Sequence, residues 1–253
     1  MILRRFKKHI SEENWFAVSV DFLVVVVGIF VGLQVEGWNQ DRKDQIDADR
    51  FLSRLYQDQL TTLIAIQEGL NELNENVGFN RSIINYIEGK TSEYPSNEAI
   101  QRGLCQWYVA PAIRIQKTVY DELVSTGRLG LITDEKLRFL LQDVHSEHER
   151  VKTDFTLMGD AVKDMALNLS PFIKWYALEG SDIKMGSAEN SGTGCRIDLD
   201  GIAKSEDARS MVAQLYRSQL IFHGFRETQA EVVQSLIDYM DQAGVGSAEG
   251  ATS

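Results

Sequence analysis

Two histidines and two glutamates form the densest group of potential metal ligands in the chain: His145, Glu147, His148 and Glu149. Imidazole and carboxylate groups bind zinc and iron, but a site needs several ligands on one face and one from another helix, such as His223. The Glu-x-x-His pattern of di-iron bundles is absent. His148 also falls on an apolar helical stripe, so we interpret it as a hydrogen-bonded core histidine and predict no metal site.

Two further motifs match ligand-binding loops only in part. Asp198-Leu199-Asp200-Gly201 matches the middle of a calcium loop, but Arg196 stands where the first carboxylate is needed. We therefore interpret this segment as a loop and a helix cap. Gly89-Lys90-Thr91 matches the end of a phosphate-binding loop, but Ile84 occupies the position of its first glycine, so we predict no nucleotide site.

The sequence contains no nucleophile elbow, Cys-His nucleophile pattern or dinucleotide fingerprint. We predict no catalytic residues, no cofactor and a protein that is not an enzyme. Carboxylates far apart in the sequence can still assemble a site in space, and spacing alone does not test that alternative.

The composition limits the classes of partner. The 253 residues include 26 Lys and Arg against 37 Asp and Glu, a formal net charge of -11. Neutralising nucleic-acid phosphates requires a surplus of basic residues, so we predict no nucleic-acid partner. Only 3 prolines are present, which favours long uninterrupted helices because proline breaks a helix interior.

An apolar segment near the N-terminus has the length of a membrane span. Residues 15–35 read WFAVSVDFLVVVVGIFVGLQV, with Asp21 as the one formal charge. A helix of that length extends roughly 30 Å, enough for the hydrocarbon core of a bilayer. Trp15 and Trp38 are placed as anchors at the two membrane interfaces. The uncharged run 22–35 is short enough for a signal-peptide core, but acidic residues precede it, so we favour a retained transmembrane helix.

Charges beside the span predict its orientation, because basic residues concentrate on the cytoplasmic side. The N-terminal tail contains Arg4, Arg5, Lys7 and Lys8. We therefore expect a bacterial inner-membrane protein with a cytoplasmic N-terminus. The predicted organisation is a cytoplasmic tail (1–14), a transmembrane helix (15–35), a periplasmic helical bundle (36–243) and a disordered tail (244–253).

Three residues of the span are candidates for contact with a partner helix: Asp21, Gly28 and Gly32. A G-x-x-x-G pattern lets two helix backbones approach closely, although glycine is also common in membrane helices generally. The carboxylate of Asp21 must reach the interface, become protonated or find a partner. We predict membrane lipid as one partner, together with other membrane-protein subunits or a second copy of the span.

Two blocks of residues carry a family resemblance. The first comprises Asp21, Gly28-Ile29, Leu33-Gln34 and Trp38-Asn39, and the second comprises Tyr120–Leu123 with Ser125–Ile132. In both blocks the chain resembles an uncharacterised family of bacterial single-span membrane proteins, and it departs at Gly32, where that family would have alanine. The resemblance implies a shared architecture without an assigned activity, and it supplies no catalytic residues.

Apolar residues after the span recur at helical spacing in three stripes. The first covers residues 52–87 and ends before Gly89, with a gap at Gln59. The second covers residues 137–169 at 4-3 spacing that includes His148. Such spacing is typical of helices packed lengthwise. The third follows Ser205 and is interrupted by Ser218 and Gln229; its members are Met211, Leu215, Phe222, Phe225, Val232, Leu236 and Tyr239.

These stripes predict an all-α fold, in which an N-terminal transmembrane helix continues into an extramembrane antiparallel helical bundle. Between the long helices we expect a loop over 89–96, a short helix from Asn97 to Trp107 and another over 118–127. Thr133 or Asp134 should cap the second long helix, and Ser170-Pro171 should end it. Residues 180–201, rich in Gly, Ser, Asn and Asp, are expected to form a mobile loop.

The topology bears on the two cysteines, Cys105 and Cys195. In an oxidising compartment the thiols can pair, whereas in the cytoplasm they would stay reduced. The alternative is two separately buried, unpaired cysteines, and sequence spacing does not decide between the two.

We expect a non-enzymatic single-pass membrane protein that acts as a scaffold or accessory subunit of a membrane assembly. The alternatives are a periplasmic ligand-sensing domain that signals through a partner and, with less support, a membrane-tethered enzyme. The predicted cytoplasmic part is too short for a signalling domain, so sensing would require a partner.

Overall fold

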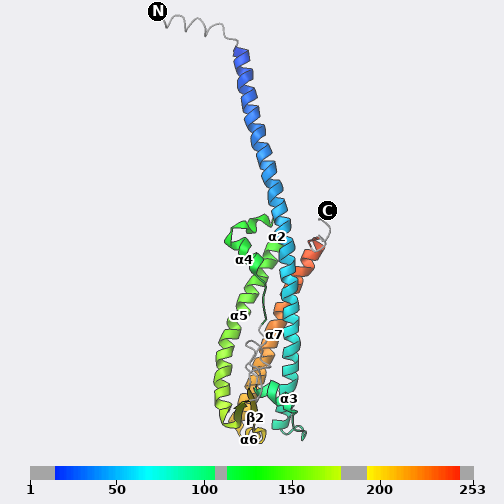
Figure 1. The fold of residues 1–253 in the computed structure, drawn as a ribbon, viewed down its shortest axis with the longest axis vertical. Helices are drawn as coiled ribbons and strands as arrows, with labels where there is room; N and C mark the ends of the chain where they lie inside the picture. Colours follow the sequence, from blue (N-terminus) through cyan, green and yellow to red (C-terminus); the bar gives the residue numbers. More distant parts are fainter. Residues whose placement is uncertain (1–14, 106–112, 178–192, 246–253) are drawn as a thin grey trace, which may run out of the picture. The chain divides into compact units, whose positions relative to one another are not determined.

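The computed structural model describes residues 15–105, 113–177 and 193–245, drawn as ribbon in Figure 1. The chain divides into two compact units, Met1–Phe51 and Leu52–Ser253, and each is described by itself. Long helices dominate both, and the described residues include a single sheet, of two strands. The all-α prediction is therefore confirmed.

The first unit contains the beginning of helix α2, which spans Trp15–Ile87 and thus continues into the second unit. Its N-terminal part is long and apolar enough to cross a membrane, and no described residue buries it. The apolar side chains from Phe22 to Val35 are exposed, as is Trp38. One helix near the N-terminus thus has the length and composition of a membrane span.

The second unit is a bundle of three long helices: α2 from Leu52 onward, α5 (Glu135–Leu169) and α7 (Glu206–Gln242). Helix α7 runs antiparallel to α2 and to α5, so α2 and α5 run parallel to each other (Figure 1). Asn80 Nδ2 of α2 donates to Gln219 Oε1 of α7 at 2.5 Å. The chain between α2 and α5 travels back along the bundle, and this return places residues 113–117 beside the long helices.

Local capping and helix-stop signals define where the long helices begin and end, at the positions that the sequence predicts. Gly89, with φ of 70°, follows the end of α2 in the left-handed region that glycine adopts at low cost. The Asp134 carboxylate accepts from Leu137 N at the start of α5, and the Ser205 hydroxyl accepts from Ala208 N at the start of α7. Ser170 and Pro171 end α5.

Short elements connect these helices. Helix α3 (Asn97–Ile100) is capped by Ser96 rather than by Asn97, and it continues as the π-helix η1 (Gln101–Cys105). The predicted second short helix is α4 (Thr118–Ser125), followed by the 3-10 turn η2 (Arg128–Leu131). The predicted helix end at Trp107 and the predicted tails at 1–14 and 246–253 lie outside the described residues.

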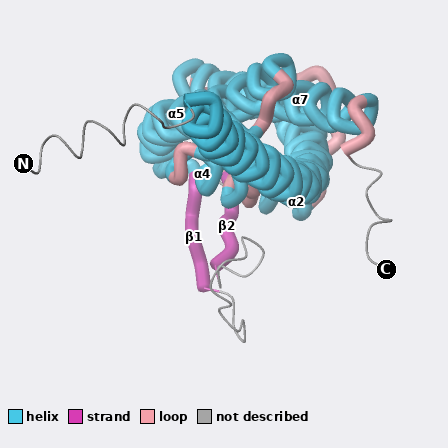
Figure 2. The backbone as a smooth tube through the Cα atoms, turned by 90° about the horizontal axis from the view of Figure 1, so that it is seen from above, coloured by secondary structure: helices cyan, strands magenta, loops and turns pink. Residues whose placement is uncertain are grey.

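The expectation of a loop over 180–201 is wrong at its C-terminal end. Strand β2 (Thr193–Ile197) pairs antiparallel with β1 (Ile173–Ala177), which follows the 3-10 turn η3 (Ser170–Phe172), and helix α6 (Leu199–Lys204) comes next. The two strands run side by side, away from the helices (Figure 2). Cross-strand hydrogen bonds organise a segment whose composition alone suggests a loop, and residues 178–192 are outside the description.

The expected stripe of α7 is displaced by one residue at several positions. The buried residues are Val212, Val233 and Met240. The sequence pattern predicts their neighbours Met211, Val232 and Tyr239 at these positions. Ser218 and Gln229, which interrupt the apolar pattern, are themselves buried. The helix thus turns a partly polar face into the bundle, because that face meets polar partners on α2 and α5.

An apolar cluster surrounds Cys105 and Cys195, which form a disulfide with Cα atoms 5.8 Å apart. Gln101 of η1 holds β2 in place, since its Nε2 donates to Cys195 O at 2.7 Å and its Oε1 accepts from Cys195 N at 3.4 Å. The disulfide therefore joins η1 to β2, and the side chain of Gln101 links the same two elements through its hydrogen bonds to the Cys195 backbone.

We predict that protein taken from its native membrane contains this disulfide. Mass spectrometry of thiol-blocked, unreduced protein should detect one linked peptide pair, and prior reduction should release it. Joining cysteines with a separation of 90 residues restricts the unfolded chain. The double variant Cys105→Ala/Cys195→Ala should thus lower the free energy of unfolding by up to about 4 kcal/mol. Two freely alkylated cysteines would contradict the pairing.

A second prediction concerns Gly103 of η1. A Cβ there would lie 2.8 Å from Ile83 Cδ1 and 2.9 Å from Asn80 Oδ1, both buried on α2. Gly103→Ala should therefore lower the free energy of unfolding by about 1–3 kcal/mol, measured by denaturant titration. Gly78→Ala, an exposed site in α2 with open space around it, should instead raise it by about 0.5–1 kcal/mol. Equal effects at both glycines would refute this packing.

Candidate functional site

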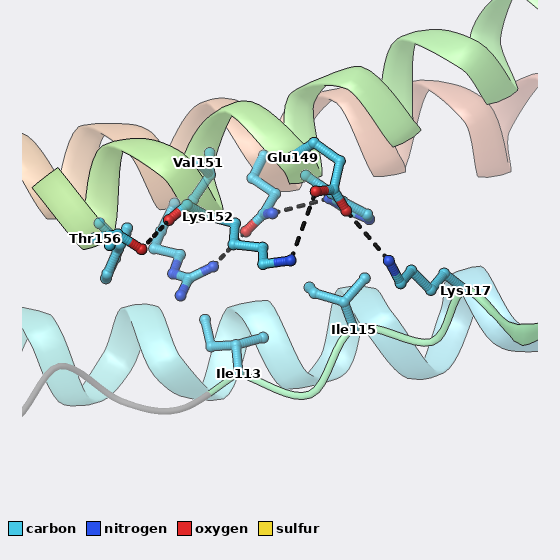
Figure 3. A pocket seen from close by; sticks show the side chains of 11 residues that line it. Ile113, Ile115, Lys117, Glu149, Val151, Lys152 and Thr156 are labelled. Carbon is cyan, nitrogen blue, oxygen red and sulfur yellow. Dashed lines mark hydrogen bonds and ion pairs between the residues drawn. The ribbon is translucent and has the colours of Figure 1, made fainter.

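A pocket of about 500 Å³ opens in the second unit between α5, α7 and the segment 113–117 (Figure 3). That volume is within the range of small-molecule binding sites. Its lining combines apolar and charged side chains: Ile113, Ile115, Lys117, His148, Glu149, Val151, Lys152, Phe155, Thr156, Arg226 and Gln229. The site is therefore formed by one short segment that runs beside two long helices.

One wall of the pocket is apolar. Ile113 and Ile115 lie on the extended segment and point toward α5 (Figure 3). Val151 and Phe155 of α5 line the same cavity. This wall offers a surface against which an apolar part of a ligand can be buried.

Glu149 lies between two lysines at the edge of the pocket (Figure 3). Lys117 Nζ is 3.2 Å from Glu149 Oε1, and Lys152 Nζ is 3.7 Å from Glu149 Oε2. The hydrogen bond from Lys117 is the largest cause of the lowered pKa of Glu149, so its carboxyl is ionised at neutral pH. Two cations thus share one carboxylate, and the edge keeps a net positive charge.

Arg226 of α7 supplies the innermost charge of the site, with 8% of its surface exposed. Its guanidinium carbon is 4.4 Å from the ring centroid of Phe155, and its Nη1 donates to Gln229 Oε1 at 2.6 Å. Among residues 15–105, 113–177 and 193–245, no carboxylate forms an ion pair with it. Burial lowers the pKa of Arg226 to about 10, so it remains a cation at neutral pH.

The hydrogen bonds around Arg226 have a defined direction. A guanidinium only donates, so Gln229 must present its carbonyl oxygen to Arg226 and its amide nitrogen to His148. Gln229 Nε2 lies 2.8 Å from His148 Nδ1. His148 Nδ1 is therefore the acceptor, and the ring carries its proton on Nε2. Burial, followed by repulsion from His145 and Arg226, lowers the pKa of His148 to about 4, in agreement with a neutral ring.

Hydrogen bonds thus form a relay from Arg226 through Gln229 to His148, and the described residues supply no acceptor for one buried donor at each of its ends. These donors are Arg226 Nε and His148 Nε2, and both residues are more than nine-tenths buried. Leaving a buried donor unpaired is costly, and such atoms are rare in folded proteins. The lining thus has a surplus of donors and of positive charge, which a ligand with anionic acceptor oxygens would satisfy.

The structure separates the histidines considered as metal ligands. His145 stacks on Tyr120 with ring centroids 4.6 Å apart, while His223 Nδ1 lies 3.4 Å from Glu227 Oε2. Within the described ranges, no three His, Cys, Asp or Glu side chains gather as a metal site would require. His148 is a buried, hydrogen-bonded residue of the bundle, and this interpretation is confirmed.

The calcium-like segment is a helix cap, as interpreted. Asp198 Oδ1 accepts from Gly201 N at 2.8 Å, at the start of α6. A Cβ at Gly201 would lie 2.5 Å from Asp198 Oδ2, so the close cap requires glycine there. Asp200 Oδ1 accepts from the Tyr86 hydroxyl at 2.8 Å.

The residues predicted to contact a partner in the membrane all belong to α2. A Cβ built at Gly28 or Gly32 meets nothing within 4 Å, so both positions are open on the first unit. The side chains of Trp15 and Asp21 lie outside the described part of the chain. Their roles, and that of Trp38 as an interface anchor, stay predictions.

Arg226 is the pocket residue that the sequence pattern does not predict. The available signal is the interruption of the α7 stripe at Gln229, because Arg226 lies three positions earlier and hence on the same helical face. Lys117 and the two isoleucines of the wall carry no periodic signal. They reach the pocket only through the path of the returning chain.

No protein-family model, no curated protein and no solved structure matches this chain. The assignment of the pocket thus depends on its own geometry and chemistry.

The relay predicts unequal costs for two substitutions. Arg226→Met removes an uncompensated buried charge together with one hydrogen bond, so the free energy of unfolding should stay within about 1 kcal/mol of the parent value. Gln229→Leu leaves both Arg226 and His148 without their partner and should lower it by about 3 kcal/mol. Denaturant unfolding monitored by circular dichroism measures both. Equal losses would contradict the proposed direction of the relay.

His148 also predicts a pH dependence of stability. Because its pKa is lowered from 6.5 to about 4, the unfolded state binds more protons between these values. Its contribution is full above pH 6.5 and is lost as the pH falls toward 4, by up to about 3 kcal/mol. Unfolding measured across this range should be less pH-dependent in His148→Gln than in the parent. An unchanged profile in His148→Gln would exclude this residue as the cause.

Proposed function

We propose that the chain is a non-enzymatic, single-span protein of a bacterial inner membrane whose extramembrane bundle binds a small anionic ligand. The observation that carries this proposal is the buried guanidinium of Arg226, which lines an open pocket and has no carboxylate partner among the residues that the structure describes. In this proposal the N-terminus is cytoplasmic and the bundle is periplasmic, as the basic tail predicts. The apolar N-terminal part of α2 supports the membrane anchor.

The charge distribution supports a selective anion site. The whole chain carries a formal -11, so its surface repels anions in general. The pocket lining, by contrast, has three cations, Arg226, Lys117 and Lys152, against the single carboxylate of Glu149. An anion is therefore attracted to this location over the rest of the surface, and the low polarity of the wall strengthens the attraction.

The same lining supports binding rather than catalysis. His148 is neutral near pH 7 and carries its proton on Nε2, so it has no free lone pair to act as a base. Glu149 is held ionised by its lysine partners. The Thr156 hydroxyl of the lining donates to Lys152 O at 3.0 Å, and both lysines pair with Glu149, so no lining residue is arranged as an activated nucleophile with a base.

A ligand in this pocket contacts α5 and α7 and the segment that joins α3 to α4. In this proposal, binding changes how two long helices pack, and the change is passed to a partner subunit. This form of the proposal combines a sensing domain with an accessory role in a membrane assembly.

A specific feature supports an accessory or scaffold role as a second candidate. The side chains of the apolar segment are exposed, and Gly28 and Gly32 leave an open strip along it. Such a strip permits close approach of another helix, from a different subunit or from a second copy.

Thermal unfolding of the full chain in detergent tests the ligand-binding proposal. Acetate, benzoate, phosphate and sulfate should be titrated separately, and at least one should raise the melting temperature in a saturable way. Arg226→Met should abolish the increase. Arg217→Met, an exposed arginine on the same helix, should retain it. Failure of every anion to shift the parent would refute this function.

Copurification after mild detergent extraction tests the accessory role. Gly28→Leu with Gly32→Leu should weaken association with partner subunits while leaving membrane insertion intact, because the added side chains separate the helices. Val27→Leu with Val31→Leu, at the same spacing on the same span, serves as the matched control. A complex that survives the glycine changes would remove this strip from consideration.

A further inference from the structure

We infer that the ligand of this pocket is a monocarboxylate with a compact apolar body, an inference that rests on the proposed anion-binding function. Charge, the free edge of the guanidinium and the apolar wall each restrict the class of anion.

The buried end of the pocket compensates one negative charge. Arg226 is a permanent cation there, and His148 contributes a neutral donor. A dianion such as phosphate would bring a second charge beside Arg226, whereas the surplus positive charge of Lys117 and Lys152 lies at the solvent-exposed edge, where both ammonium groups share Glu149. An unpaired buried charge is strongly unfavourable, so the site favours a monoanion.

The free edge of the guanidinium suits a carboxylate. Arg226 uses Nη1 for Gln229 and one face for the ring of Phe155. The other edge consists of Nε and Nη2, and the described residues supply no hydrogen-bond acceptor to either atom. Nε is closed to solvent, so a planar carboxylate accepts two parallel hydrogen bonds from this edge only when the lining adjusts around it. His148 Nε2, for which the described residues also supply no acceptor, is closed to solvent in the same way.

The apolar wall accounts for the rest of the ligand. Ile113, Ile115, Val151 and Phe155 line a cavity of about 500 Å³, much larger than a carboxylate group alone. A ligand as small as acetate would leave this wall in contact with water. Each methylene buried against it should tighten binding roughly fourfold.

Calorimetric titration of the full chain in lipid nanodiscs, with protein-free nanodiscs subtracted, tests the inference. The probes are acetate, butyrate, hexanoate and benzoate, with hexanamide and benzamide as neutral controls and inorganic phosphate as the dianion, all titrated at about pH 8.5, where phosphate carries two charges. Affinity should rise from acetate to hexanoate by roughly fourfold per methylene. The amides and phosphate should bind at least about tenfold more weakly than hexanoate.

Variants assign the two halves of the ligand. Arg226→Met should abolish carboxylate binding, and Arg217→Met should not. Ile115→Ala, on a half-buried side chain, should weaken hexanoate but leave acetate unchanged. These opposite selectivities separate loss of a contact from loss of the fold.

Each contrary result has a distinct meaning. Phosphate binding more tightly than hexanoate, and lost in Arg226→Met, would overturn the monocarboxylate and leave the anion-binding function intact. Hexanoate binding that survives Arg226→Met would overturn the assignment to this pocket. Absence of binding by every probe would overturn both the inference and the proposed function.

Discussion

The middle of this bundle is organised around a buried guanidinium for which the described residues supply no carboxylate partner. Arg226 lies between α5 and α7, where a single amide, that of Gln229, connects it to His148. Arg226 can only donate, so Gln229 must accept from it and donate to His148 Nδ1. The tautomer of His148 therefore follows from the position of Arg226. The arrangement pairs the inner atoms and leaves Arg226 Nε and His148 Nε2 without an acceptor among the described residues.

The apolar cluster and the candidate pocket occupy different parts of the second unit. The apolar cluster around the Cys105–Cys195 disulfide includes residues of α2, α5, α7 and the short elements, but none that line the pocket. A neighbouring polar contact, Asn80 with Gln219, fixes the register of α2 against α7. Strain or desolvation at the pocket can thus be offset by packing elsewhere, which is how proteins commonly retain unfavourable groups at functional sites.

The sequence by itself determined the helical class and most helix boundaries. A 3.6-residue repeat of apolar side chains reports which residues avoid water, and capping groups such as Asp134 and Ser205 act within one turn of the chain. The apolar N-terminal segment is likewise a local property. Hydrogen bonds across β1 and β2 are not local, so the composition of residues 193–197 predicted a loop where a strand forms.

Only the tertiary structure decided which residues make the site. His148 and Gln229 are far apart in sequence, and they meet because α7 runs antiparallel to α5. Ile113 and Ile115 reach the pocket because the chain must return along the bundle between two parallel helices. Sequence spacing reveals the face of a single helix, whereas the partner of each face depends on the packing of the whole bundle. For that reason the sequence shows Arg226 as an ordinary helical arginine, and only its burial, with no ion-pair partner among the described residues, distinguishes it.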